Sequence, residues 1–275
     1  MTTIAEIATL DDIELELPAR PAVLAELSAE LKASDPDYRK VSNLVNKDIG
    51  LAAAVVKTAN TPFFGIAGRI TSVQQAIHFL GLAQVFSLVT GVMLRRAFPE
   101  NDSLISALWD VSTKRAAVMS HLALNTSVPP DRAYTVGLFQ DCGVALLTMR
   151  SREYRQTWED TRWLPNGPTI ELSRHVVAHP SLSALLVKHW GLAGEIVDAV
   201  KHHHDMDELD TLDSSRTQSF VALSVFANYG LVQALSQDAS PWAESVDKAA
   251  AILDLSPLAT EAWIVQANML LEPLH

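Results

Sequence analysis

The stretch from Asp48 to Gly81 constrains the fold most, because it predicts two packed helices joined by a short turn. Asp48 is a good N-cap, and apolar residues recur at helical spacing after it, which predicts a helix over 49–60 with one buried stripe. We expect Asn60 to end this helix in the left-handed conformation. Ser72 then caps a second helix, with a glutamine three residues later in the position of a capping box. Both apolar stripes must be buried against other helices.

Helical patterns continue along the chain, and no convincing series of strands or internal repeat appears. Long helices are expected over 82–98, 103–125 and 215–235, with shorter helices between them. We therefore predict an all-α fold, in which an N-terminal helical subdomain over 1–100 packs on a second helical subdomain over 101–275. The connection between the two subdomains is too short for freely moving domains.

Smaller features mark expected boundaries of elements. Ser103, Ser240 and Ser256 each stand where a helix is expected to begin, so we interpret them as caps. Gly143 is expected to interrupt a helical pattern. Apolar and acidic residues alternate over 13–17, which predicts a brief extended segment.

Composition and charge exclude several classes of partner. Of the 275 residues, 48% are hydrophobic, which is ample for a buried core. The formal charge of −11 repels phosphate backbones and anionic lipids, so we expect neither a nucleic acid nor a membrane as partner. We interpret small basic patches such as Lys114-Arg115 as solvated helix faces. The single cysteine, Cys142, is expected to be a small buried hydrophobe and suits a reducing cytoplasm, where we expect the protein.

Histidines gather in one part of the chain, where they are candidate metal ligands or proton carriers. Six of the nine lie between positions 175 and 204: His175, His179, His189, His202, His203 and His204. Three consecutive histidines on a helix point about 100° apart, so at most one or two of them can face a common centre. The proline after His179 places that side chain at a helix junction.

The turn and the helices beside it carry a series of short motifs in order: Lys57-Thr58-Ala59-Asn60, Phe63-Phe64-Gly65, Arg69-Ile70-Thr71-Ser72, Gln75-Ala76-Ile77 and Leu80-Gly81. These motifs closely resemble the bacterial HDOD family, the HD-related output domain. The resemblance continues more weakly to His203-His204, and so covers about residues 10–205 as a single HDOD domain. It implies the multi-helical HDOD fold, with an N-terminal helical subdomain packed on an HD-like helical core.

The resemblance also implies a degenerate metal site. HD-domain phosphohydrolases bind metal through a histidine, a following His-Asp pair and a later aspartate. The matching positions in this chain are Val111, Gln140-Asp141 and Asn228, so Asp141 alone keeps the type of ligand found in the family. Valine has no lone pair, and neutral amides are poor replacements for imidazole and carboxylate. We therefore expect no catalytic residues and no cofactor.

Related phosphodiesterases of the HD-GYP type add further histidines, which His179, His203 and His204 match. With Asp141, these three are weak candidates for holding a metal. Each also has a simpler interpretation. Asp141 would bond a backbone amide, Gln140 would fill the vacated pocket, and the two adjacent histidines would lie at a helix end with His204 solvated.

The resemblance implies a non-catalytic bacterial regulatory protein that acts in signal transduction by binding another protein. Its expected partners are signalling proteins or a nucleotide second messenger. Phe63 and Phe64 are interpreted either as a staple that holds the turn on the core or as a partner surface. Two alternatives are a divergent metal-dependent phosphohydrolase and a nucleotide sensor that binds without turnover.

Overall fold

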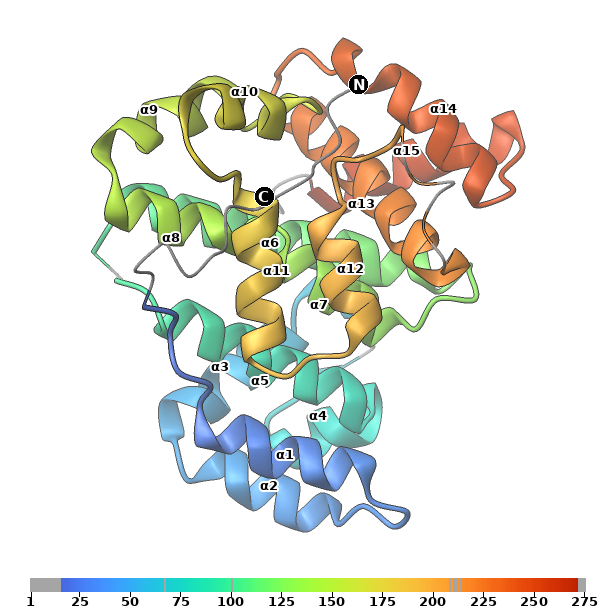
Figure 1. The fold of residues 1–275 in the computed structure, drawn as a ribbon. Helices are drawn as coiled ribbons and strands as arrows, with labels where there is room; N and C mark the ends of the chain where they lie inside the picture. Colours follow the sequence, from blue (N-terminus) through green and yellow to red (C-terminus); the bar gives the residue numbers. More distant parts are fainter. Residues whose placement is uncertain are drawn as a thin grey trace.

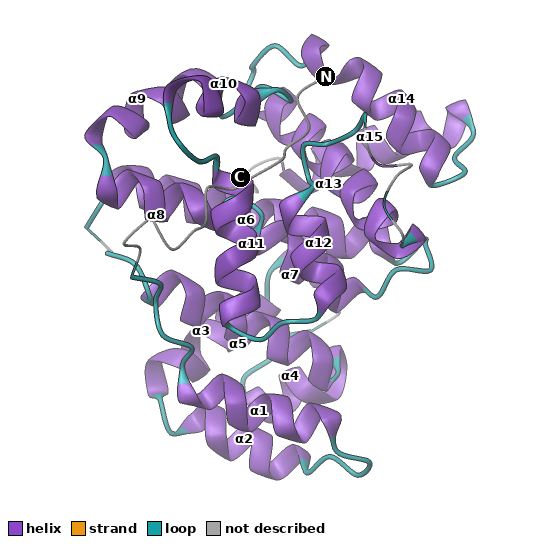
Figure 2. Ribbon diagram, viewed as in Figure 1, coloured by secondary structure: helices purple, strands orange, loops and turns teal. Residues whose placement is uncertain are grey.

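The structure is a computed structural model, and it describes residues 16–66, 68–99, 101–207, 209, 212 and 214–271. All regular secondary structure within those residues is helical, which confirms the predicted all-α fold (Figure 2). The extended segment expected over 13–17 falls mostly outside them. None of the described helices combines the length and the apolar character needed to cross a bilayer.

A first group of helices packs mainly against itself and occupies the lower part of Figure 1. The members of this group are α1 (Ala22–Lys32), α2 (Tyr38–Asn46), α3 (Ile49–Ala59), the 3-10 turn η2 (Pro62–Phe64), α4 (Val73–Leu80) and α5 (Leu82–Arg96). Helix α5 links this group to the rest of the chain. It packs on α1, α3 and α4 within the group and on α7 outside it.

Two of the predicted caps in this group are present. The Asp48 side chain accepts a hydrogen bond from the Leu51 amide at 2.8 Å, and the Ser72 hydroxyl accepts one from the Gln75 amide at 3.1 Å. Gln75 reaches back to the Thr71 amide at 2.7 Å. These bonds satisfy amides at the first turns of α3 and α4, where the helix itself offers no acceptor.

Asn60 does not adopt the left-handed conformation expected of it, since its φ is −86°. Its side chain instead bridges the turn between α3 and α4. The Asn60 oxygen accepts from the Ile70 amide at 2.8 Å, and its nitrogen donates to the Ile70 carbonyl at 2.7 Å. The left-handed residue of the turn is Gly65, with φ +58°. The turn is therefore fixed by a side chain that pairs with the backbone ten positions later.

A second group of helices contains the candidate site residues and forms the upper part of Figure 1. It contains α6 (Ser103–Ala123), α7 (Pro130–Phe139), α8 (Cys142–Arg150), α9 (Arg152–Thr161), α10 (Gly167–Arg174), α11 (His179–His189), α12 (Gly194–Lys201), α13 (Ser215–Ala234), the 3-10 turn η4 (Ser240–Trp242), α14 (Ala243–Ile252) and α15 (Pro257–Leu271).

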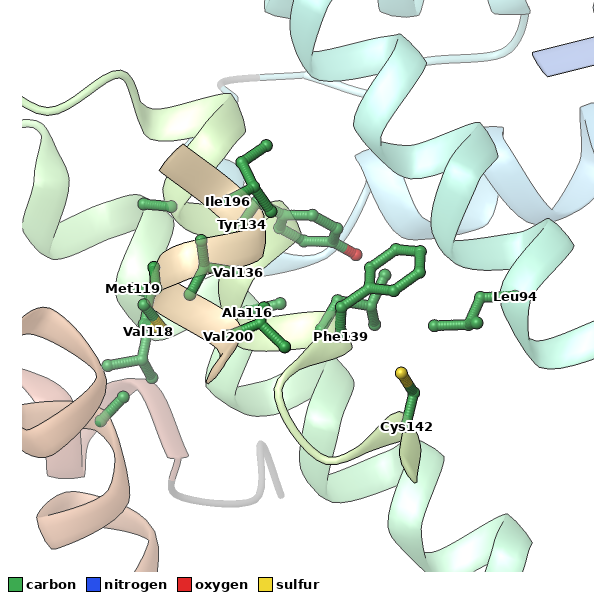
Figure 3. Packing of buried hydrophobic residues seen from close by; sticks show 14 of the residues in the cluster. Leu94, Ala116, Val118, Met119, Tyr134, Val136, Phe139, Cys142, Ile196 and Val200 are labelled. Carbon is green, nitrogen blue, oxygen red and sulfur yellow. The ribbon is translucent and has the colours of Figure 1, made fainter. Parts of the chain in front are cut away.

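Helix α7 lies at the centre of the packing and contacts α5, α6, α12 and α13. Figure 3 shows buried side chains gathered around it, among them Leu94 from α5, Ala116 from α6, Val136 from α7 and Val200 from α12. Cys142, at the start of α8, is fully buried in the same core, as expected. One continuous core therefore joins the two groups of helices.

The Phe63-Phe64 turn lies against this second group. Both side chains are half-buried, and the Phe64 ring lies 6.3 Å from the Tyr134 ring, centroid to centroid. The η2 turn also contacts α6. This packing agrees with the staple interpretation, while the partner surface stays a prediction.

Two of the three predicted serine caps are wrong. Asp102, and not Ser103, caps α6, because its carboxylate accepts from the Leu104 and Ile105 amides at 3.0 and 3.2 Å. Ser240 begins the η4 turn and makes no side-chain cap. The serine before α15 does cap that helix, as predicted, since its hydroxyl accepts from the Ala259 amide at 3.3 Å.

Gly143 does not interrupt a helix, because α7 ends at Phe139 and α8 begins at Cys142, with Gly143 in its first turn. Gly143 is needed for close packing of α8 on α11. A Cβ at this position would lie 2.2 Å from the His179 carbonyl oxygen and 2.8 Å from the Ser183 amide nitrogen. This approach holds the start of α11, and with it His179, against the N-terminus of α8.

We predict that Gly143→Ala destabilises the protein by about 3 kcal/mol, because the methyl group forces backbone apart in a packed core. Gly194→Ala is the matched control, since Gly194 also lies in the first turn of a helix but has no atom within 4 Å of a new Cβ. It should change the free energy of unfolding by less than about 1 kcal/mol. Urea unfolding followed by circular dichroism measures both, and equal effects would refute the packing argument.

Candidate functional site

Three segments bring one aspartate and three histidines to a common centre. Asp141 lies between α7 and α8, His179 is the first residue of α11, and His203 and His204 lie in the turn after α12. One potential ligand atom from each residue lies within 4.8 Å of those from the other three. Asp141, His179 and His203 are almost fully buried, while His204 is half-buried. We call these four residues the histidine cluster.

Two of the three consecutive histidines face this centre, in agreement with the prediction of at most two. They do not lie on a helix, because α12 ends at Lys201. His202 points elsewhere and pairs with Asp205 at 2.9 Å. The expectation that His204 is solvated is wrong. Its Nδ1 bonds the Pro165 carbonyl at 2.7 Å, and its ring lies beside those of His203 and His179.

Each histidine of the cluster uses its Nδ1 for a bond that leads away from the centre. These bonds run from His179 to Glu171 Oε1 at 2.8 Å, from His203 to the Val200 carbonyl at 2.7 Å and from His204 to the Pro165 carbonyl at 2.7 Å. A carbonyl accepts only, so the Nδ1 atoms of His203 and His204 carry the protons. The Nε2 atoms of these two side chains therefore keep a lone pair.

The cluster fits a metal ion by the type and number of its donors. Three imidazole nitrogens and one carboxylate oxygen suit zinc and other divalent transition metals. A histidine that ligates a metal commonly donates its other N–H to a carboxylate or a carbonyl, as all three do here. His179 and His203 each place Nε2 at 3.3 Å from the same oxygen of Asp141. An ion at this centre would be held by Asp141, His179, His203 and His204.

The charges of the histidine cluster are also compensated when no metal is bound. Burial opposes protonation of His179, but the carboxylates of Glu171 and Asp141 outweigh it and raise its pKa to about 9. Burial lowers the pKa of His203, and burial with the neighbouring imidazoles lowers the pKa of His204 well below its usual range. At neutral pH His179 is therefore an imidazolium, and the other two histidines are neutral.

Arg115 is the second cation at Asp141. Its Nη2 lies 2.7 Å from Asp141 Oδ2, and its Nε donates to Asn228 Oδ1 at 2.7 Å. Burial raises the pKa of Asp141, but the Arg115 charge and the bond from the protonated His179 outweigh it and hold the pKa well below its usual range. The guanidinium thus joins Asp141 and Asn228, two of the positions that we predict to match metal ligands of HD enzymes.

The interpretation of Arg115 as part of a solvated helix face is wrong, because only 4% of the residue is exposed. Lys114 is exposed, as expected. One signal in the sequence points to Arg115. It lies one helical turn after Val111 on α6, and therefore on the same face as the position that matches the first histidine.

The remaining matched positions divide between two cavities. Gln140 and Asn228 line a cavity with Asp141, and its volume is about 10 Å³. That volume holds about one water molecule and no larger ligand. Gln140 Oε1 has no hydrogen-bond partner among the described residues. Val111 does not line this cavity but an adjoining one between α6 and the end of α9.

Glu171 and Trp158, to which no sequence motif points, complete the surroundings of His179. Glu171 is fully buried and also accepts from the His179 amide at 2.8 Å. The Trp158 ring meets the His179 ring edge to face at a centroid distance of 5.5 Å. No motif marks either residue, because both come from helices that precede His179 and reach it only through the fold.

We predict that Arg115→Met destabilises the protein by about 3–5 kcal/mol, because it leaves the buried Asp141 carboxylate without its main counter-charge. Adding Asp141→Asn should recover part of this loss. Arg95→Met is the matched control, since Arg95 pairs with Asp110 at 3.3 Å and half of its side chain is exposed. The control should lose less than about 1 kcal/mol in urea unfolding. Equal losses for the two methionine variants would contradict the assigned role.

Comparisons with known proteins agree with the fold. The family model of the HDOD domain matches residues 17–206. An uncharacterised protein of Treponema pallidum is 22% identical over 206 residues, which are 72% of this chain and 40% of the relative. The chain thus matches less than half the length of that relative.

Two solved structures share the fold. An HDOD domain protein of unknown function from Geobacter sulfurreducens is 21% identical, with a TM-score of 0.72 over 92% of this chain and 89% of its own. A Shewanella amazonensis protein, provisionally named a metal-dependent phosphohydrolase, is 16% identical, with a TM-score of 0.70 over 97% and 96%. The family match extends over most of the chain, and the fold agrees with it. The chain therefore belongs to the HDOD domain family, which is related to the HD phosphohydrolases.

Proposed function

We propose that this protein is a non-catalytic component of bacterial signal transduction that acts by binding another protein. The observation that carries the proposal is the Arg115 guanidinium bound between Asp141 and Asn228. Arg115 supplies a permanent positive charge where HD phosphohydrolases place a metal between the matching ligands. Because arginine stays protonated at any physiological pH, this charge does not leave the site.

Hydrolysis of a phosphoester in an HD-type site requires a metal with an open position, where a water is activated and the phosphoryl charge is neutralised. The cavity beside Asp141 has a volume of about 10 Å³, and three indoles line it, those of Trp158, Trp163 and Trp242. A phosphoester and its attacking water do not fit in that space. This argues against turnover, and equally against a nucleotide sensor that uses the same cavity.

A second candidate function is metal-dependent phosphoester hydrolysis by the histidine cluster. It is favoured by the arrangement of His179, His203 and His204, whose Nδ1 atoms bond outward and leave the Nε2 atoms for an ion. The Shewanella relative bears a name of that kind. A single ion would polarise a bound phosphoryl oxygen and lower the pKa of a bound water. Access to it would require the surrounding tryptophans to move.

The partner surface that we propose includes the Phe63-Phe64 turn. The two half-buried rings line an open groove of about 350 Å³, together with Phe79 and Leu124. Phe79 is 59% exposed and Leu124 is 66% exposed, which is unusual for such large apolar side chains lying close together. A signalling protein with apolar side chains on a helix or a loop would bury this surface. The net charge of −11 supports a protein partner over a nucleic acid or an anionic membrane.

We predict no metal-dependent turnover. The protein, stripped with chelator and then supplied with Mn²⁺, Fe²⁺ or Zn²⁺, should hydrolyse bis-p-nitrophenyl phosphate and cyclic dinucleotides no faster than a buffer blank. Elemental mass spectrometry on the same samples reports whether metal is bound. Hydrolysis that requires metal and disappears in His179→Gln and His203→Gln would instead establish the phosphohydrolase, provided that both variants are folded.

Partner capture should depend on the groove and not on the histidine cluster. We predict that Phe79→Ser reduces recovery of a cross-linked signalling partner at least about fivefold. His203→Gln, if folded by circular dichroism, should recover the same partner as the unchanged protein. Val176→Ser is the matched control, because Val176 is also strongly exposed but lies away from the groove. Loss of the partner in His203→Gln with full recovery in Phe79→Ser would reverse the assignment.

A further inference from the structure

Helix α15, in the upper part of Figure 1, is apolar on both of its faces. The inner face packs on α13 and buries Trp263. The outer face exposes three large apolar side chains, since Leu258 is 78% exposed, Val265 52% and Met269 68%. Glu261 is the sole charged residue between positions 257 and 271. A helix that is apolar all round is normally buried on every side, so the outer face of α15 is suited to a covering surface.

The exposed apolar residues of α15 form one straight stripe. Leu258, Ala262, Val265 and Met269 are all exposed, and they follow each other at intervals of four, three and four residues. Because successive residues of a helix turn by about 100°, these four side chains lie within a sector of about 60°. The same spacing is found along the contact line of a two-stranded coiled coil. The stripe is about 16 Å long and can therefore pack along a second helix.

The order of the four residues makes the stripe self-complementary. Its intervals read the same from either end, so a twofold axis between positions 263 and 264 relates two antiparallel copies of the helix. This axis places Leu258 level with Met269 of the second copy, and Ala262 level with Val265 of the second copy. The smaller side chains lie at the centre, where they let the two helices approach closely. A twofold contact between identical subunits requires a self-complementary patch of this kind.

The distribution of charge also favours a second copy on this face. Two chains with a net charge of −11 repel each other, so a contact between them needs a face that is almost free of acidic groups. The stripe contains no charged residue, and Glu261 lies at its edge. The twofold axis shifts Glu261 by five residues from its copy, which is about 7.5 Å along the helices. The remaining repulsion between the two carboxylates is screened by salt.

We propose that two copies of this protein form a twofold dimer through antiparallel α15 helices. A contact along one helix buries less than about 800 Å² per partner, the size of a standard interface, so the dimer is weak and forms with a dissociation constant in the micromolar range. Helix α15 lies beyond residues 17–206, which match the family model. The dimer goes beyond the proposed function and does not depend on it, because the stripe shares no residue with the groove beside Phe63-Phe64.

Sedimentation equilibrium of the full chain, from low micromolar to about 0.5 mM, measures the dimer directly. We expect the dimer fraction to rise with concentration. Val265→Glu brings two carboxylates to the centre of the contact and should weaken dimerisation at least about tenfold. Ile49→Glu is the matched control, because Ile49 is 84% exposed at the start of α3, and it should dimerise as the unchanged protein does. A monomer at every concentration would leave α15 to a different chain and overturn the proposal, as would equal weakening in the two variants.

Single cysteines test the antiparallel arrangement. Position 262 lies three residues from its copy across the twofold axis, about 4.5 Å along the helices, whereas position 258 lies about 16 Å from its copy. A short bis-maleimide should therefore join two copies of Ala262→Cys but not two copies of Leu258→Cys. The unchanged protein is the background control, since its Cys142 is fully buried. Equal cross-linking of the two variants, or none in Ala262→Cys, would refute the arrangement.

The phosphoesterase and partner assays report on the proposed function separately, so either proposal can fail alone.

Discussion

The buried carboxylate of Asp141 is the group around which the candidate site is organised. A carboxylate removed from water must be compensated by opposite charge and hydrogen bonds. Here Arg115 from α6 and protonated His179 from α11 provide both, and Glu171 from α10 balances the imidazolium in turn. Four segments of the chain therefore meet through alternating charges, at the point where Gly143 lets α8 and α11 come together.

We propose that this network takes the place of a metal ion in holding an HD-type core together. Val111 offers no donor atom, and Asn228 has become an acceptor for Arg115. In this proposal the arginine bridges two of the predicted ligand positions, but unlike a metal it has no exchangeable water and no Lewis acidity. Fold similarity to phosphohydrolases thus carries little information about turnover, because function depends on the site and not on the fold.

Local features of the fold could be predicted, while features that depend on distant partners could not. Asp48 and Ser72 cap helices through amides three residues away, so the sequence pattern is sufficient. The role of Asn60 could not be predicted, because its partner, the Ile70 backbone, lies across a turn. Arg115 follows an exposed lysine and therefore resembles a surface residue in the sequence. Only the fold shows that it contacts Asp141. The resemblance to HDOD identified Asp141 and the histidines, but spacing alone would not have brought them together.

The most direct test of the central claim is a crystal structure of the protein grown with excess Mn²⁺, with anomalous diffraction data collected to locate the ion. The account predicts that the Arg115 guanidinium stays bonded to Asp141 and Asn228, with no ion in its place, whether or not the histidines hold one. An ion that bridges Asp141 and Asn228, with the arginine displaced, would contradict this prediction and would support a metal-dependent enzyme instead.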